Sequence, residues 1–176
     1  MTRAKVTDED CIQFLLATLK VCSATEAARV QADGGESPAH DAFTRLLHRL
    51  EPDVETLGKR PRHRLNDEGV FGGDDSMLDK PSAEKVALVQ RHWSAKHHAM
   101  VEGINLLTLL WTDGDRHVPL DYRVYNKARD GLTKNNHFRA LLETAYLQGF
   151  VPECGVFDSW NSGLENLKQI RDWEWT

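Results

Sequence analysis

The sequence lacks the features that mark membrane and secreted proteins. Its most apolar stretch, residues 104–111, is far too short to cross a bilayer. The N-terminus, MTRAKVTDED, has no apolar core of a signal peptide. The three cysteines are widely spaced and form no CxxC pair, which argues against a zinc knuckle and a disulfide framework. We therefore expect a protein of the reducing cytoplasm, with no membrane among its partners.

The chain also lacks an excess of positive charge. Its 176 residues carry a net charge of −5, so any contact with nucleic acid has to be local. The one dense basic run lies in an expected linker over residues 59–68. Its members either contact DNA phosphates or lie in solvent: Lys59, Arg60, Arg62 and Arg64.

Helical patterns fill the part before this linker, residues 1–58. Thr7 with Asp10 resembles a capping box, and Ser23 with Glu26 matches one fully. A third helix is expected to open at Ser37. Two sets of apolar residues recur at helical spacing and predict buried faces: Ile12, Leu15, Leu16 and Leu19, then Phe43, Leu46, Leu47 and Leu50.

Two interpretations of these helices stay open. The second and third could form a helix-turn-helix, in which His40, Thr44 and Arg45 would face DNA. Alternatively these residues form the solvated faces of structural helices. We favour the second interpretation, because the connecting loop is longer than the tight turn of that motif.

Carboxylates follow two segments that have strand character. The short run VFGG at residues 70–73 leads into Asp74 and Asp75, and Cys154–Phe157 leads into Asp158. Two strands that each end in aspartate can supply two oxygen ligands to a hard divalent cation. The nearby histidines His92, His97 and His98 suggest a metal site as well, but no second cluster supplies further ligands, so we interpret them as surface residues.

The segments between these aspartates predict the remaining strands. Residues 100–111 are typical of a buried strand, and the Asp-Gly pair that follows predicts a hairpin turn. Residues 118–124 then alternate, with Leu120, Tyr122 and Val124 on the apolar side and Asp121 and Arg123 on the polar side. Pro119 lacks a backbone donor and places this strand at a sheet edge.

The helices that follow complete the expected fold. Thr133 opens a helix that Gly149 ends, and this crossover makes Cys154–Phe157 parallel to the first strand. Asn161 or Ser162 opens the last helix. A first strand that lies between the hairpin and the fourth strand is the ribonuclease-H-like arrangement. We expect an α/β fold with a ribonuclease-H-like mixed sheet over residues 69–176, in which Asp75 and Asp158 share one metal ion.

Several segments resemble consecutive blocks of bacterial insertion-sequence transposases of the DDE type, among them GGDDSMLDKP, DGLTKNNHFRALLETA and FDSWNSGLENLK. The resemblance implies metal-dependent DNA cleavage and strand transfer in DNA transposition, with Mg²⁺ (or Mn²⁺) as cofactor. It implies transposon ends and target DNA as partners and leaves a homo-oligomer open. The family's first two acids match Asp75, with Asp74 as the alternative, and Asp158. Lys80 is a candidate contact to a DNA phosphate.

The chain departs from the family pattern at the third acid, a glutamate on a helix after a fifth strand. Glu165 and Glu174 lie too early to match it, and Asn161 and Ala95 stand where relatives carry other residues. We therefore expect a truncated portion of a transposase that does not catalyse alone. The alternative is a non-catalytic, DNA-binding or dimerising remnant that inhibits an intact transposase. A phosphatase is disfavoured, because Asp75 and Asp79 are too far apart for an aspartate-x-aspartate signature.

Overall fold

The computed structural model describes residues 6–19, 22–31, 38–51, 57, 65, 68–83, 85–94 and 96–176. The chain divides into two compact units, Met1–Pro52 and Asp53–Thr176, which are described one at a time. The basic residues of the expected linker lie outside the described residues, so their contact with DNA stays a prediction: Lys59, Arg60, Arg62 and Arg64.

The first unit contains the short helices α1 (Asp8–Ala17), α2 (Ala24–Val30) and α3 (His40–Arg49). The capping box at Thr7 is confirmed, since its hydroxyl accepts from the Asp10 amide while the Asp10 carboxylate accepts from the Thr7 amide. The predicted start of the third helix is wrong. Its N-cap is Ala39, which makes no side-chain cap bond.

The predicted buried faces of this unit are only partly correct. Its core gathers residues from all three helices and the segment before them: Val6, Phe14, Ala27, Ala42, Phe43 and Leu46. Three short helices can cover only a small apolar surface between them. Most of the predicted apolar positions are therefore exposed: Ile12, Leu15, Leu16, Leu19, Leu47 and Leu50.

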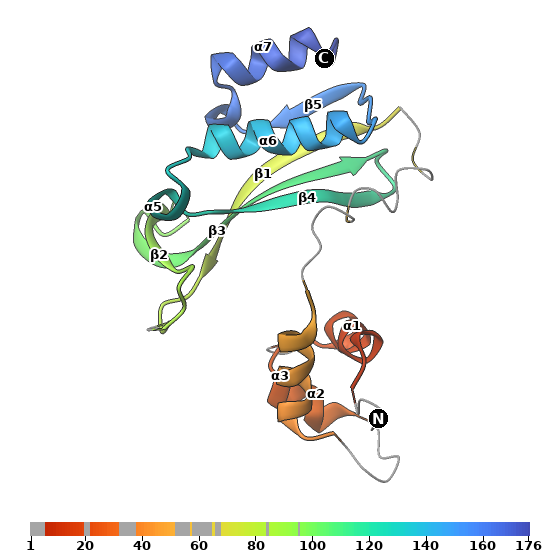
Figure 1. Ribbon diagram of the computed structural model, residues 1–176, viewed down its shortest axis with the longest axis vertical. Helices are drawn as coiled ribbons and strands as arrows, with labels where there is room; N and C mark the ends of the chain where they lie inside the picture. Colours follow the sequence, from red (N-terminus) through yellow and green to blue (C-terminus); the bar gives the residue numbers. More distant parts are fainter. Residues whose placement is uncertain are drawn as a thin grey trace. The chain divides into compact units, whose positions relative to one another are not determined.

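In the described residues of the second unit, five strands form one mixed sheet. They are β1 (Val70–Asp79), β2 (Gln90–Ser94), β3 (Ala99–Thr112), β4 (His117–Tyr125) and β5 (Cys154–Phe157). The order is β2-β3-β1-β5, and β4 pairs with β3 as well. β1 is antiparallel to β3 and parallel to β5, which confirms the predicted place of the first strand (Figure 1).

The long strand β3 organises the sheet. One of its edges pairs with β1, while the other pairs with β2 over residues 99–103 and with β4 over residues 105–112. The predicted hairpin is confirmed, with Gly114 in the left-handed region at a φ of 95°. Pro119 lies on β4, which pairs only with β3 among the described strands, so the predicted edge position is confirmed too.

A bulge overturns the alternation predicted for β4. Leu109 pairs with Asp121 but Leu110 pairs with Pro119, so Leu120 is an extra residue. The bulge turns Leu120 and Asp121 both inward, and both are buried. Arg123 follows on the same face and bonds Asp121 at 3.0 Å, so the predicted polar side of this strand lies under the covering helix.

Four helical segments follow β4 along the chain among the described residues: α5 (Lys127–Asp130), α6 (Lys134–Leu147), η1 (Ser159–Asn161) and α7 (Leu164–Asp172). The predicted cap at Thr133 and the stop at Gly149, with a φ of 79°, are both confirmed. The predicted opening of the last helix is wrong. Gly163 is its N-cap, and Asn161 lies in η1.

Helix α6 covers one face of the sheet and builds the main core with it (Figure 1). The central members come from β1, β3, β4 and α6: Phe71, Leu107, Leu109, Trp111, Leu120, Phe138, Leu141 and Leu142. Gly73 belongs to this contact, because a Cβ there would lie 2.4 Å from the Phe138 ring. Gly73 thus serves close packing within a strand that continues to Asp79.

Candidate active site

The parallel pairing of β1 with β5 brings the two predicted acids to adjacent strands. The last paired residues are Gly73 and Phe157. In the same register Asp158 lies opposite Asp74, which is one residue before Asp75. Adjacent strands lie about 4.8 Å apart. The predicted position of the first acid at a strand end is wrong, however, because β1 continues along β3 to Asp79 after β5 has ended.

The pleat of β1 separates the two candidate first acids. Successive side chains point to opposite faces, and Gly73 faces α6, so Asp75 lies on the α6 side and Asp74 on the other. Asp75 is half-buried, whereas Asp74 is exposed and accepts a hydrogen bond from Ser76 at 3.1 Å. This difference favours Asp75 over Asp74 as the acid of an enclosed site. Asp158 is level with Asp74 in the strand register, but it begins the turn η1, which packs against α6.

Asp158 is positioned by the turn that it begins. Its Oδ1 accepts from the Ser159 hydroxyl at 3.0 Å and from the Trp160 amide at 3.3 Å, which makes it the N-cap of η1. Among the described residues, no hydrogen bond uses its other carboxylate oxygen. One oxygen therefore orients the side chain and the other is available to a ligand.

Lys134, the first residue of α6, forms an ion pair with Asp75. The two residues are 59 positions apart in the sequence, and their side chains are 35% and 24% exposed. The ammonium also lies over the Tyr125 ring, 5.7 Å from its centroid. Nothing in the sequence pattern linked Lys134 with Asp75; the one available signal was a cation in the first turn of a helix, where the helix dipole disfavours it.

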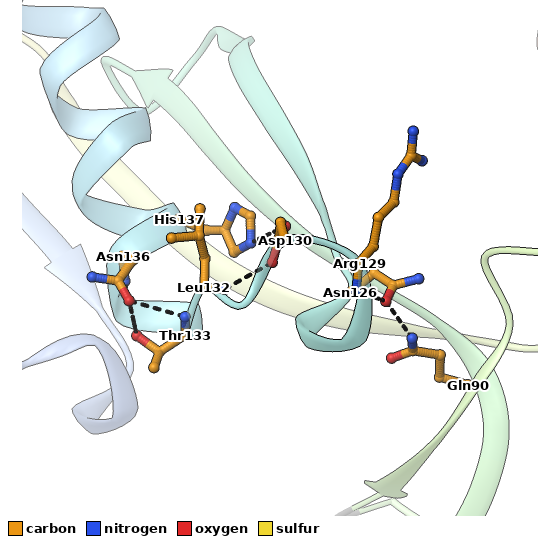
Figure 2. A network of polar contacts seen from close by, with 8 residues as sticks. All are labelled: Gln90, Asn126, Arg129, Asp130, Leu132, Thr133, Asn136 and His137. Atoms are coloured by element: carbon orange, nitrogen blue, oxygen red, sulfur yellow. Dashed lines mark hydrogen bonds and ion pairs between the residues drawn. The ribbon is translucent and has the colours of Figure 1, made fainter.

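A network of polar contacts surrounds the junction of α5 and α6, where Lys134 begins its helix (Figure 2). The Thr133 hydroxyl and the Asn136 side chain form a reciprocal capping box. Asp130 accepts from the Leu132 amide at 2.9 Å and lies 3.1 Å from the buried His137 ring. Further back, Asn126 caps α5 and bonds Gln90 of β2.

His92 differs from its predicted position on the surface. It is half-buried on β2, with its ring 6.0 Å from Tyr125 and its Nε2 without a hydrogen-bond partner in the described structure. Burial, followed by the nearby Lys134 charge, lowers the pKa of His92 below its ordinary value. His97 and His98 are exposed as predicted, and His97 lies 2.9 Å from Asp79.

Lys80 is not brought to the aspartate pair. It is exposed, and its amide bonds the Glu102 carbonyl at 2.8 Å at the far end of β1. An extended strand rises about 3.3 Å per residue, which separates Lys80 from Asp75 by roughly 16 Å. A DNA phosphate at Lys80 would therefore lie well away from the proposed metal ligands.

The donor set fits a hard divalent cation in type, because carboxylate oxygens are the ligands that Mg²⁺ prefers. It is incomplete in number. No group of three His, Cys, Asp or Glu side chains that could hold a metal ion occurs among the residues described. Glu165 is exposed on α7 and bonded to Lys168 at 2.9 Å, and this hydrogen bond lowers its pKa.

No family model, curated protein or solved structure matches this chain. The resemblance to transposases therefore stays a prediction. In the described part of the chain, no helix is long and apolar enough to cross a bilayer.

Proposed function

We propose that the unit Asp53–Thr176 is part of a metal-dependent DNA phosphoryl-transfer protein of the DDE transposase type, built on a ribonuclease-H-like sheet. One observation carries the proposal. The strand β1 lies between an antiparallel hairpin and the parallel strand β5, so Asp75 lies on β1 and Asp158 directly follows the neighbouring strand. This is the strand order that the ribonuclease-H-like arrangement requires.

Asp75 and Asp158 are the residues that would hold Mg²⁺ or Mn²⁺. When bound, such an ion activates the attacking oxygen and stabilises the leaving oxygen of a phosphodiester. The chain's own contribution is positional: the β1–β3 ladder fixes Asp75, and the η1 cap orients Asp158. Asp74 lies on the opposite face of β1, so we assign the role to Asp75 and keep Asp74 as the alternative.

The described residues supply only part of such a site. Two carboxylates do not neutralise two divalent ions, and magnesium gives up its water reluctantly. We therefore propose that this chain binds the ion weakly and does not cleave or join DNA unless another segment or a second chain supplies a third ligand.

A second candidate function is a non-catalytic module that associates with an intact transposase. The exposed apolar residues of the first unit favour it, because Leu16 and Leu19 on and after α1 are almost entirely in solvent. Contiguous exposed apolar residues mark surfaces that bind other proteins. In this case the association would persist when both aspartates are replaced.

The test is Mn²⁺ binding by calorimetry to the parent chain and to Asp75→Asn, Asp158→Asn and Asp74→Asn. We expect the first two variants to weaken binding at least about tenfold, because each removes one of two charged ligands. Asp74→Asn is the matched control, since it removes the same charge from the adjacent position on the opposite face, and it should bind like the parent. Equal binding by all four proteins would place the ion elsewhere and overturn the proposed site.

A further inference from the structure

We propose that Lys134 is a built-in counter-ion for Asp75, which competes with the divalent cation for that carboxylate. The inference rests on the proposed function, because it takes Asp75 as a metal ligand. It adds a residue that sets how strongly the site binds its ion.

The first support is the contact itself. The Lys134 ammonium pairs directly with Asp75, and both side chains are half-buried. It also lies over the face of Tyr125, which attracts a cation. Burial lowers the pKa of His92, and the nearby Lys134 charge lowers this pKa further. Lys134 thus occupies one side of the Asp75 carboxylate, at Oδ2, and neutralises the charge that would attract a metal ion.

The second support is the position of Lys134 in α6. It is the first residue of a 14-residue helix that has no acidic residue in its first turn. The N-terminus of a helix carries partial positive charge, so a lysine there is disfavoured by its own helix. The capping box uses Thr133 and Asn136 and does not require Lys134. The stabilising partners of this lysine are therefore Asp75 and Tyr125.

The third support is the fixed backbone at the junction of α5 and α6. The hydrogen bonds around Asn126, Asp130 and Thr133 hold the start of α6 in position (Figure 2). These bonds tie down the backbone at Lys134, whereas its side chain is a flexible four-carbon stem. Metal binding must displace the ammonium by rotating this side chain, and the cost of that step weakens the metal affinity of the parent chain.

The experiment compares Mn²⁺ binding to the full chain and its variants, followed by the electron paramagnetic resonance signal of free Mn²⁺. Lys134→Met removes the charge and keeps much of the apolar stem, and Lys134→Arg keeps the charge. Lys134→Met should tighten Mn²⁺ binding severalfold, because the ion then no longer has to displace an ammonium from the carboxylate. Lys134→Arg keeps the competing charge and should bind like the parent.

Lys168→Met is the matched control. It also removes a lysine that is paired with a carboxylate, because Lys168 bonds Glu165 at 2.9 Å on exposed α7. It should leave Mn²⁺ affinity unchanged. Equal tightening by Lys134→Met and Lys168→Met would mean that any released carboxylate collects the ion, and would overturn the proposal.

The outcomes separate this inference from the proposed function. If Asp75→Asn weakens binding but Lys134→Met does not tighten it, the metal site stands and the counter-ion role is wrong. If Asp75→Asn has no effect, the metal site itself is wrong. Circular dichroism of each variant shows whether it is folded, and a Lys134→Gln variant replaces Lys134→Met if the latter does not fold.

Discussion

The sheet face that α6 covers has two dissimilar ends. At one end, Phe71 packs edge-on against Phe150 and Trp175, and the surrounding residues are apolar. At the other end, where α6 begins, the same face carries Asp75, Lys134 and the buried Asn105. Strand β1 runs through both ends without interruption.

This difference separates the part of the sheet that stabilises the fold from the part that carries the proposed site. The apolar end is paired on both sides of β1 and covered by rings, so its residues serve stability. At the polar end, several buried polar atoms lack a hydrogen-bond partner in the described residues, among them Asn105 Oδ1 and His92 Nε2. Polar groups of this kind are costly to bury and gather at functional sites.

The largest expected effect comes from truncation at the apolar end. Phe71 is 2% exposed and contacts two aromatic rings. Phe71→Ala should lower the free energy of unfolding by about 3–5 kcal/mol, measured by urea denaturation. Met77→Ala, on the same strand and face, is the control. Met77 is only half-buried at the polar end. This variant should therefore lower the free energy of unfolding by only about 1 kcal/mol. Similar losses for both variants would remove the distinction between the two ends.

A smaller effect is expected from pH at the polar end. The pKa of His92 is lowered in the folded protein, first by burial and then by Lys134, so the folded state binds fewer protons than the unfolded state. The stability that neutral His92 contributes is therefore complete above its ordinary pKa of 6.5 and is lost as the pH falls below that value.

The test of this effect is denaturation of His92→Gln and the parent chain between pH 8 and pH 5. The parent should lose more stability than the variant over the acidic part of that range, because only the parent has a ring that takes up a proton more readily in the unfolded state than in the folded state. An identical slope in both proteins would show that His92 is solvated at this end of the sheet.

Much of the fold could be predicted because its signals are local. The apolar run of β3, the Asp-Gly turn before β4 and the cap at Thr133 each lie within a few residues of the structure that they specify. The strand order followed from these elements and from the handedness of the crossover.

The errors occurred where distant residues decide the structure. The length of β1 depends on pairing with all ten residues of β3 that lie opposite it, and this pairing keeps Asp74 and Asp75 in the strand. The bulge at Leu120 depends on its register against Leu109 and Leu110. The exposed apolar residues of α1 reflect how little surface three short helices can cover.

The candidate site was predicted only in part, because its residues come from distant parts of the sequence. The strands that carry Asp75 and Asp158 were identified from the sequence, and their adjacency is confirmed. The ion pair with Lys134 was missed, since no periodic pattern relates residues 59 positions apart.

A crystal structure of the chain soaked in Mn²⁺ tests the central claim most directly, because the anomalous signal of the ion locates it. We predict one Mn²⁺ bound by oxygens of both Asp75 and Asp158, at ligand distances of about 2 Å, with the Lys134 ammonium turned away. Carboxylates more than roughly 10 Å apart, beyond the reach of any shared ion with such ligand distances, or an ion bound elsewhere, would contradict the account.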